Sequence, residues 1–333
     1  MTRRRGRSAI PAPLISAINA TQAPLVVTHE QPDGDAIGSL FSMSYLLGGL
    51  GKSCTLFCTN RVPYSFDWLA HDGELRHEWP IAEAFDCVIA LDCADSGRPG
   101  VPLIDETTAR GGVVINIDHH ATNTQFGRYN WVDPAKAATA QMVYELAAEL
   151  RVEVTLPFAQ AVYCGLLTDT GSFRYSNTSP EAMRIAAELL EIGVEPWGVS
   201  SAIYENQPVE RIRLIQRVLS TLDLSACGRF ASLSVTRRIF DETGTTPEML
   251  DGLVNYARSI RGVQLAILFQ EVDTDRWKVS FRSRGHVDAA AIAVHFSGGG
   301  HRNAAGCTLD WPLDRARDEI YRAIGLQLDG DEA

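Results

Sequence analysis

The sequence has no apolar run approaching the ~20 residues that a membrane-spanning helix needs. Its basic start, MTRRRGRS, is not followed by the apolar core and small-residue cleavage site of a secretory leader. These absences exclude the usual signals for membrane insertion and export. We therefore expect a cytoplasmic protein without a membrane partner, and a disordered tail over residues 1–11.

Positive charge is also scarce. Lys and Arg number 30 against 41 Asp and Glu, which gives a formal net charge of −11. Proteins that grip long nucleic acids carry a basic face, because phosphate neutralisation supplies much of their affinity. Long nucleic acid is therefore not the expected partner. A small anionic ligand is compatible with this charge if metal ions and a few arginines offset its phosphates.

The few cysteines form no recognisable pairing pattern. They are odd in number, and none shows the C-x-x-C spacing of zinc and redox sites. Most lie in apolar stretches, which favours buried, reduced thiols over a disulfide framework. The cysteines occupy positions 54, 58, 87, 93, 164, 227 and 307.

What the sequence does have is enough length and apolar character for two ordinary domains, with 333 residues of which 45% are hydrophobic. Short continuous apolar runs alternate with helical patterns over the first half. This alternation is typical of a parallel sheet with helices on both faces. The predicted strands are 24–28, 53–58, 87–91 and 113–117, and the predicted helices are 37–50, 139–150 and 157–167.

The pattern changes after a helical stretch predicted over 180–223. The final part of the chain indicates a smaller mixed α+β domain, with a hairpin turn at Asp273–Asp275. We expect a first domain over 12–190, a helical linker over 191–225 and a second domain over 226–328. The predicted strands of the second domain are 230–235, 263–272 and 276–283, and its predicted helices are 247–260, 287–296 and 313–324.

Residues suited to metal binding follow the first predicted strand. His29, Asp33 and Asp35 lie within seven residues, between that strand and the next predicted helix. In open α/β sheets, ligands bind beyond the carboxyl ends of the strands. An imidazole and two carboxylates suit Mn²⁺ or Mg²⁺, and the imidazole favours Mn²⁺. An ordinary polar turn is the alternative, since Pro, Asp and Gly are common turn residues.

Three further polar positions fall at the ends of predicted elements. Asp92 follows one strand, where a lone carboxylate is common in loops. His119 and His120 follow another strand, and Asp118 before them is placed to orient an imidazole. Asp169 ends a predicted helix, where a negative charge opposes the helix dipole unless a cation compensates. Taken with the first strand end, these positions predict a cluster for two metal ions ~3.5–4 Å apart.

A glycine run in the second domain is a weaker signal. Gly298–Gly300 and His301 follow a predicted helix, so the run lacks the strand-to-helix context of a Walker phosphate loop. Glycines allow backbone N–H groups to approach a ligand closely, and Arg282 and His301 add phosphate donors. A surface loop without a ligand is the alternative for this run taken by itself.

Together these motifs resemble those of the DHH phosphoesterase superfamily and its DHHA1 subfamily. The resemblance implies a DHH catalytic domain over 12–190, a DHHA1 substrate-binding domain over 226–328, and an active site in the cleft between them. The segments that carry it are 29–39, 92–98, 118–127 (DHHATNTQFG) and 167–175 for the four DHH motifs, and 297–306 for the GGGH-x-x-AAG signature of DHHA1.

Carried over residue by residue, the resemblance implies a site for two divalent cations, most simply Mn²⁺, with Mg²⁺ as the other candidate. The implied catalytic residues are Asp92, which would bridge the ions, Asp118, and His120, which would face the scissile phosphate. The implied metal ligands are His29, Asp33 and Asp92 for one ion, and Asp35, Asp92, His119 and Asp169 for the other. The implied substrate-binding residues are Arg98, Arg282, Ser283, Gly298, Gly299, Gly300, His301 and Asn303.

The length of the chain and the type of its second domain reduce the number of activities that the resemblance implies. The two-domain form resembles the nanoRNase group, which degrades short oligonucleotides and dephosphorylates 3′-phosphoadenosine 5′-phosphate (pAp). Related members also cleave cyclic di-AMP or its linear product pApA. A RecJ-like exonuclease on longer DNA or RNA is one alternative, although such enzymes carry further nucleic-acid-binding domains. A nucleotide sensor without turnover is the other alternative, and a homodimer is a further expectation.

Overall fold

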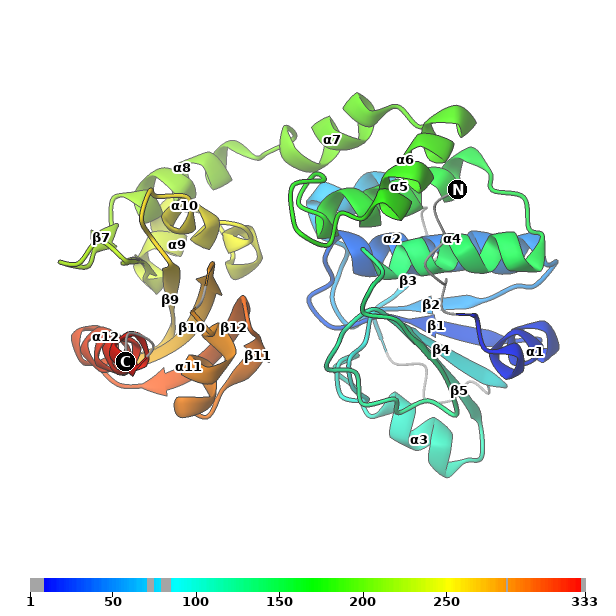
Figure 1. Ribbon diagram of the computed structural model, residues 1–333, viewed down its shortest axis with the longest axis horizontal. Coiled ribbons are helices and arrows are strands. Elements are labelled where there is room, and N and C mark those ends of the chain that lie inside the picture. Colours follow the sequence, from blue (N-terminus) through cyan, green and yellow to red (C-terminus); the bar gives the residue numbers. More distant parts are fainter. Residues whose placement is uncertain (1–8, 71–74, 79–84, 286, 331–333) are drawn as a thin grey trace. The chain divides into compact units, whose positions relative to one another are not determined.

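The computed structural model describes residues 9–70, 75–78, 85–285 and 287–330. The chain forms two compact units, Met1–Asn206 and Gln207–Ala333, each with its own sheet (Figure 1). Most of the predicted tail over residues 1–11 lies outside the described residues. No helix within these described ranges is both long and apolar enough to cross a bilayer.

The first unit is built on a fully parallel sheet in the strand order β3-β2-β1-β4-β5-β6. Strands β1 and β4 are continuously apolar because both faces are covered: Leu25 and Val27 belong to one core, and Val26 belongs to the other. The strands are β1 (Pro24–Val27), β2 (Thr55–Phe57), β3 (Leu75–Arg76), β4 (Cys87–Leu91), β5 (Val113–Asp118) and β6 (Tyr129–Val132).

Helices cover both faces of this sheet, as the continuous apolar strands predict. Helix α3 contributes Leu103 and Ile104 to the smaller core, and the other helices contribute to the larger one. The helices are α1 (Ala12–Ala20), α2 (Gly34–Gly49), η1 (Tyr64–Leu69, a 3-10 helix), α3 (Leu103–Ala109), α4 (Thr139–Leu150), α5 (Leu156–Asp169), α6 (Pro180–Ile192) and α7 (Pro196–Tyr204).

The strand order changes direction at β1, which has β2 on one side and β4 on the other. Such a switch point is where open α/β sheets bind ligands, beyond the carboxyl ends of the strands. Strands β1, β4 and β5 are neighbours, and their carboxyl ends lead into His29, Asp92 and His119. The topology therefore brings three of the predicted motifs to one sheet edge.

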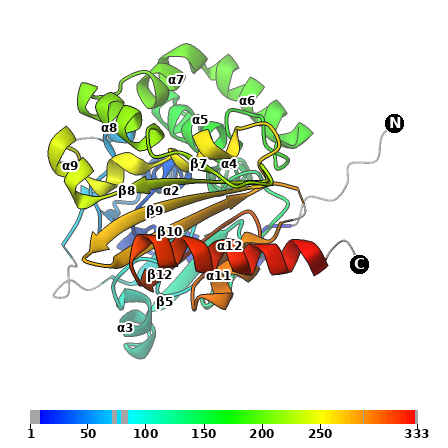
Figure 2. The same ribbon diagram turned by 90° about the vertical axis from the view of Figure 1, so that its left-hand side faces the viewer.

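The second unit is a mixed sheet in the order β11-β12-β10-β9-β8-β7, in which only the β8–β9 pair is parallel. Helices α11 and α12 pack on one face (Figure 2), and α8, α9 and α10 pack on the other. The strands are β7 (Asp223–Leu224), β8 (Phe230–Val235), β9 (Leu265–Asp273), β10 (Arg276–Ser283), β11 (Gly299–His301) and β12 (Ala304–Asp310). The helices are α8 (Val209–Leu219), α9 (Arg237–Thr243), η2 (Pro247–Leu250, 3-10), α10 (Val254–Arg258), α11 (Ala289–His295) and α12 (Leu313–Gly330).

The predicted fold class is confirmed, but two predicted segments differ locally. The helix expected over 247–260 is two short helices, because Gly252 between them adopts a left-handed φ of 76°. The glycine run is not an irregular loop, since Gly299–His301 pairs with β12 as an edge strand. Gly300 has a φ of 140°, and a Cβ there would lie 2.5 Å from the Cα of Ala305. The hairpin itself therefore requires this glycine.

Candidate metal centre

His119 lies among three carboxylates. Its Nε2 is 3.5 Å from Asp92 Oδ1, 3.8 Å from Asp35 Oδ2 and 3.8 Å from Asp169 Oδ2. These separations exceed the optimum for a hydrogen bond. Ligand atoms that each lie ~2.1 Å from one cation are themselves about 3–3.5 Å apart. The spacing therefore suits donors arranged around an ion.

His29 completes a second group on the other side of Asp92. Its Nε2 lies 3.6 Å from Asp92 Oδ2 and 3.9 Å from Asp33 Oδ1. Its Nδ1 lies 2.8 Å from the Glu30 carbonyl, which aims Nε2 at the carboxylates. Asp92 thus presents one oxygen to His119 and the other to His29. Three groups are each tight enough to hold a metal ion: His29–Asp33–Asp92, Asp35–His119–Asp169 and Asp92–His119–His120.

Local sequence explains how the two aspartates of the first turn take different positions. Asp33 is the N-cap of α2, where its Oδ1 accepts hydrogen bonds from the N–H groups of Asp35 and Ala36. Asp35, in the first turn of α2, is buried and points to the first turn of α4 instead. One carboxylate therefore stays at the surface of the cluster while the other lies inside it.

The electrostatics of the cluster fit a site that needs cations. Burial and the neighbouring Asp92 raise the pKa of Asp35 well above its usual range. Burial raises the pKa of Asp169 to about 7, although His119 opposes this rise. Burial lowers the pKa of His119, but Asp92, Asp35 and Asp169 outweigh it and raise the pKa to about 9. Without metal, protons neutralise part of this charge, and divalent cations can replace them.

His120 belongs to a chain of hydrogen bonds at the edge of the cluster. Its Nδ1 donates to Asp118 Oδ1 at 2.7 Å, and Asp118 is fully buried. Asn123 Nδ2 donates to the other oxygen, Asp118 Oδ2, at 2.6 Å. His120 is also the most exposed of the three imidazoles, with 23% of its side chain exposed against 13% for His119 and 6% for His29. Its ring is therefore both oriented and accessible.

A backbone hydrogen bond of Arg98 holds its loop beside this site. The Arg98 carbonyl accepts a 2.8 Å hydrogen bond from the N–H of Glu30, which joins the loop after β4 to the turn after β1. The Arg98 side chain is half-buried. The loop that carries Arg98 is thereby fixed beside His29.

The substrate residues predicted in the second unit gather around one turn. Arg282 pairs with Ala304 across β10 and β12, beside the turn that carries Asn303. Ser283 is buried, and its hydroxyl donates to the Arg302 carbonyl at 2.9 Å. Gly298–Gly300 lead into the same turn along β11, while the His301 side chain lies outside the described part of the chain. These residues form a group of their own in the second unit.

The sequence did not single out three residues that hold the cluster. Thr139, Asn123 and Asn177 each donate a side-chain hydrogen bond to a predicted site carboxylate. Of these, Thr139 has a feature in the sequence that could have identified it. It opens a predicted helix whose N-cap position is Ala138, a residue that cannot cap. The Asp35 carboxylate supplies that cap from a distant part of the chain.

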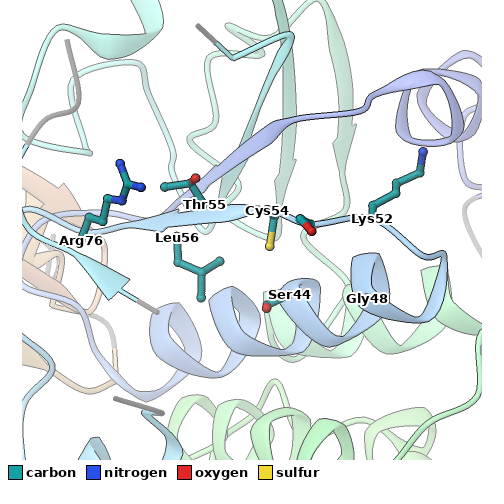
Figure 3. A pocket seen from close by; sticks show the side chains of 8 residues that line it. Ser44, Gly48, Lys52, Cys54, Thr55, Leu56 and Arg76 are labelled. Carbon is teal, nitrogen blue, oxygen red and sulfur yellow. The ribbon is translucent and has the colours of Figure 1, made fainter. Parts of the chain in front are cut away.

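A pocket of about 380 Å³ lies elsewhere in the first unit, between the second half of α2 and the start of β2 (Figure 3). Cys54 and Leu56 point from the strand toward α2, and Lys52 points away from it. The Lys52 ammonium already donates to the carbonyls of Asn19 and Thr21. None of the predicted ligands lines this pocket, so it is separate from the candidate metal centre.

Comparison with known proteins identifies the same family as the sequence motifs. Residues 24–166 match the N-terminal domain of the DHH family, and residues 229–325 match the DHHA1 domain. A protein of Thermus thermophilus named bifunctional oligoribonuclease and PAP phosphatase NrnA is 38% identical, over 93% of this chain and 92% of its own. Its namesake from Bacillus subtilis is 27% identical over 89% of this chain and 92% of its own.

A solved structure shows the same likeness. The exopolyphosphatase-related protein of Bacteroides fragilis matches with a TM-score of 0.87 and 26% identity, over 96% of this chain and 98% of that one. The resemblance drawn from the sequence motifs is therefore confirmed. The chain belongs to the DHH family, with a DHHA1 domain following its DHH domain.

Proposed function

We propose that this protein is a metal-dependent phosphoesterase that degrades short oligonucleotides and removes the 3′-phosphate of pAp. The observation that carries the proposal is the cluster of imidazoles and carboxylates at the carboxyl edge of the parallel sheet. The names of the two relatives, oligoribonuclease and PAP phosphatase, support the same substrates. Cyclic di-AMP and pApA contain the phosphodiester linkage of short oligonucleotides, and we include them as further substrates.

The residues fit two divalent cations, and we assign the ligands as the sequence motifs imply. His29, Asp33 and Asp92 would hold one ion, and Asp35, Asp92, His119 and Asp169 would hold the other. Mixed imidazole and carboxylate donors without thiolate favour Mn²⁺, with Mg²⁺ as the second choice. Bound ions supply an activated water and neutralise charge on the reacting phosphate.

The protein's own residues orient His120, which can donate a hydrogen bond to the reacting phosphate. In the metal-free protein, burial lowers the pKa of His120, but the hydrogen bond to Asp118 and the charge of Asp92 outweigh it and raise the pKa above its ordinary value. A protonated His120 can donate a hydrogen bond to a phosphate oxygen that gains negative charge. Asp118 keeps the ring in this orientation, and Asn123 in turn keeps Asp118 in place.

The second unit would hold the remainder of the substrate. Arg282, His301 and Asn303 offer donors to phosphate, and Gly298–Gly300 offer backbone N–H groups. Ser283 supports this group indirectly, since its hydroxyl holds the turn rather than facing solvent. Arg98 in the first unit is the remaining proposed substrate contact. Homodimer formation stays a prediction.

Chelation followed by metal addition tests the proposal. We expect protein dialysed against a chelator to lose hydrolysis of both pApA and pAp, and added Mn²⁺ to restore it. Full turnover after exhaustive chelation would refute a metal-dependent mechanism. Restored metal binding without hydrolysis of either substrate would favour the nucleotide sensor instead.

A further inference from the structure

One short segment, Lys136–Ala140, contacts the Asp35–His119–Asp169 half of the metal cluster and the shared Asp92. The N–H groups of Thr139 and Ala140 donate to the two oxygens of Asp35 at 2.6 and 2.9 Å. The Lys136 carbonyl lies 3.3 Å from His119 Nδ1. The Ala137 carbonyl accepts from Asn177 Nδ2, which also donates to Asp169 Oδ2 at 3.1 Å. The segment thereby reaches Asp35, His119 and Asp169.

The fourth contact of the segment is the most informative. The Thr139 hydroxyl donates to Asp92 Oδ1 at 2.9 Å. Asp92 Oδ1 is the oxygen that faces His119, whereas Oδ2 faces His29. A hydrogen bond to one oxygen of a carboxylate fixes its rotation. The hydroxyl therefore orients the Asp92 carboxylate, with one oxygen toward His119 and the other toward His29.

The other half of the cluster is supported differently. His29 is oriented by the carbonyl of its neighbour Glu30, and Asp33 by the first turn of its own helix. The side chain of Asp33 is 60% exposed, whereas Thr139 is fully buried. Neither His29 nor Asp33 depends on the segment in any contact found among the described residues.

A buried polar network holds the segment in place. The Lys136 ammonium lies 2.8 Å from both oxygens of Glu145 and 3.2 Å from Glu181. Gln141 joins the two parts, because it accepts from the N–H of Ala137 and donates to Glu145. A buried charge network of this kind fixes one geometry even where it adds little net stability. The segment is thus a fixed support for the ligands it contacts.

We infer that Thr139 is a positioning residue that maintains chiefly one of the two metal positions, the one formed by Asp35, Asp92, His119 and Asp169. The inference rests on the proposed two-metal function. Removing the hydroxyl leaves Asp92 Oδ1 without its protein donor and lets the shared carboxylate rotate. Loss of a residue that orients a ligand costs about 10- to 100-fold in metal affinity. The other position also uses Asp92, but His29 and Asp33 keep their local support.

Titration of metal-free protein with Mn²⁺ tests this inference, with calorimetry for affinity and elemental analysis for stoichiometry. Thr139→Val keeps the shape and removes the donor, so it should weaken one of two ions at least about tenfold and weaken the other by a clearly smaller factor. Thr139→Ser, which keeps the hydroxyl, should bind both ions nearly as the unaltered protein does. Asn177→Leu, which removes the donor to Asp169, should reproduce the selective loss.

Thr108→Val is the matched control, because the Thr108 hydroxyl donates to the Ile104 carbonyl of its own helix α3, outside the cluster. It should leave both affinities unchanged. If Thr139→Val binds two ions as tightly as the unaltered protein, or loses both equally, the inference is wrong and the proposed function still stands. If the unaltered protein itself binds fewer than two ions, the two-metal assignment fails and this inference fails with it.

Discussion

Asp92 adopts a left-handed backbone conformation, which is uncommon for residues other than glycine. It follows the last residue of β4 with a left-handed φ of 58°, and its N–H donates to the Ile117 carbonyl of the neighbouring strand. A left-handed non-glycine residue costs on the order of 1 kcal/mol. The conformation turns a buried carboxylate toward both His29 and His119. Strain of this kind is typical of functional sites, which agrees with the shared position of Asp92.

Replacing Asp92 by asparagine tests that shared position. Because Asp92 serves both proposed ions, Asp92→Asn should lower turnover on pApA about a thousandfold or more. The variant should still fold, since neutralising one of several clustered carboxylates relieves repulsion in the metal-free state. Asp95→Asn, in the same loop and exposed, is the control. Near-normal turnover in a folded Asp92→Asn variant would remove Asp92 from the site.

A second prediction at the residue scale concerns the DHHA1 unit. Arg282→Ala and His301→Ala should raise KM for pApA about tenfold or more, because each would remove a proposed phosphate donor, while metal content stays unchanged. Lys278→Ala, an exposed cation on the same strand β10, is the control. Metal loss in the Arg282 or His301 variant would contradict their assignment to substrate.

At the residue scale, the sequence predicts the ligands of the cluster but not the residues that support them. His29, Asp92 and His119 were predicted because each follows an apolar strand, and the parallel topology brings those strand ends together. Thr139 and Asn177 were not predicted as site residues. Their positions depend on how α4 and the turn after α5 pack against the cluster, and no periodicity in the sequence specifies that packing. Asn123 lay inside a recognised motif, but only its contact with Asp118 reveals what it does.

At the scale of elements, the crossing of α2 and α5 leaves room for Asp35. A Cβ built on Gly165 of α5 would lie 2.7 Å from Asp35 Oδ1 and 2.5 Å from the Cβ of Ala140. A Cβ built on Gly38 of α2 would lie 2.5 Å from the Ala161 carbonyl oxygen. The two helices are therefore closer than larger side chains allow. Their small residues keep a buried carboxylate beside the first turn of α4.

Gly165→Ala should disturb this arrangement even though alanine favours helices. We expect a loss of about 1–3 kcal/mol in the free energy of unfolding, from overpacking, together with weaker Mn²⁺ binding. Gly48→Ala is the control, because nothing lies within 4 Å of its added Cβ, and it should be neutral or stabilise by up to about 1 kcal/mol. Denaturant unfolding and Mn²⁺ titration measure both effects. Unchanged metal affinity in a folded Gly165→Ala variant would contradict the account of this crossing.

The helices and strands were predictable where a local sequence pattern alone determines the secondary structure. Strands β4, β8 and β10 match their predicted ranges: β4 is a continuous apolar run, β8 is buried throughout, and β10 begins with alternating buried and exposed residues. Strand β6 was missed: it has a single buried residue, Trp131, and its pairing with β5 defines it. Strand β12 was also missed, because Ala304–Asp310 is rich in small residues whose partner strands supply the order. Pairing between distant segments is not encoded in a local period.

At the scale of the whole molecule, protons and metal ions compete for the same cluster. His119 has an ordinary pKa of 6.5 and a pKa of about 9 in the folded, metal-free protein. Between these values the folded state holds more protons than the unfolded state, so this contribution is present below pH 6.5 and lost as the pH rises through 9. Asp169 acts in the same direction up to its pKa of about 7.

The stability of the metal-free protein should therefore fall between pH 6.5 and 9, and Mn²⁺ affinity should rise over the same window as protons are displaced. Urea unfolding without metal and Mn²⁺ titration at several pH values measure the two trends. The control is Thr108→Val on α3, which lies outside the cluster and should follow both trends unchanged. Stability that increases across this window, or an affinity independent of pH, would contradict the cluster electrostatics.

The overall charge bears most directly on the proposed substrate. With a net charge of −11, the protein should repel each additional phosphate that no metal or arginine contacts, and more strongly at low salt. Proteins that hold long single strands use a basic groove with aromatic stacking, at roughly 4–16 nucleotides per module. The composition offers no surplus of cations for such a groove.

The central measurement is therefore kcat/KM against oligonucleotide length, from two to about twenty nucleotides, with pAp alongside, at low and high salt. We predict that efficiency falls steeply beyond about five nucleotides, that the fall is steeper at low salt, and that pAp is dephosphorylated. Processive degradation of strands of about twenty nucleotides, as efficient as that of dimers, would contradict the proposed function. It would identify the protein as an exonuclease for long single strands.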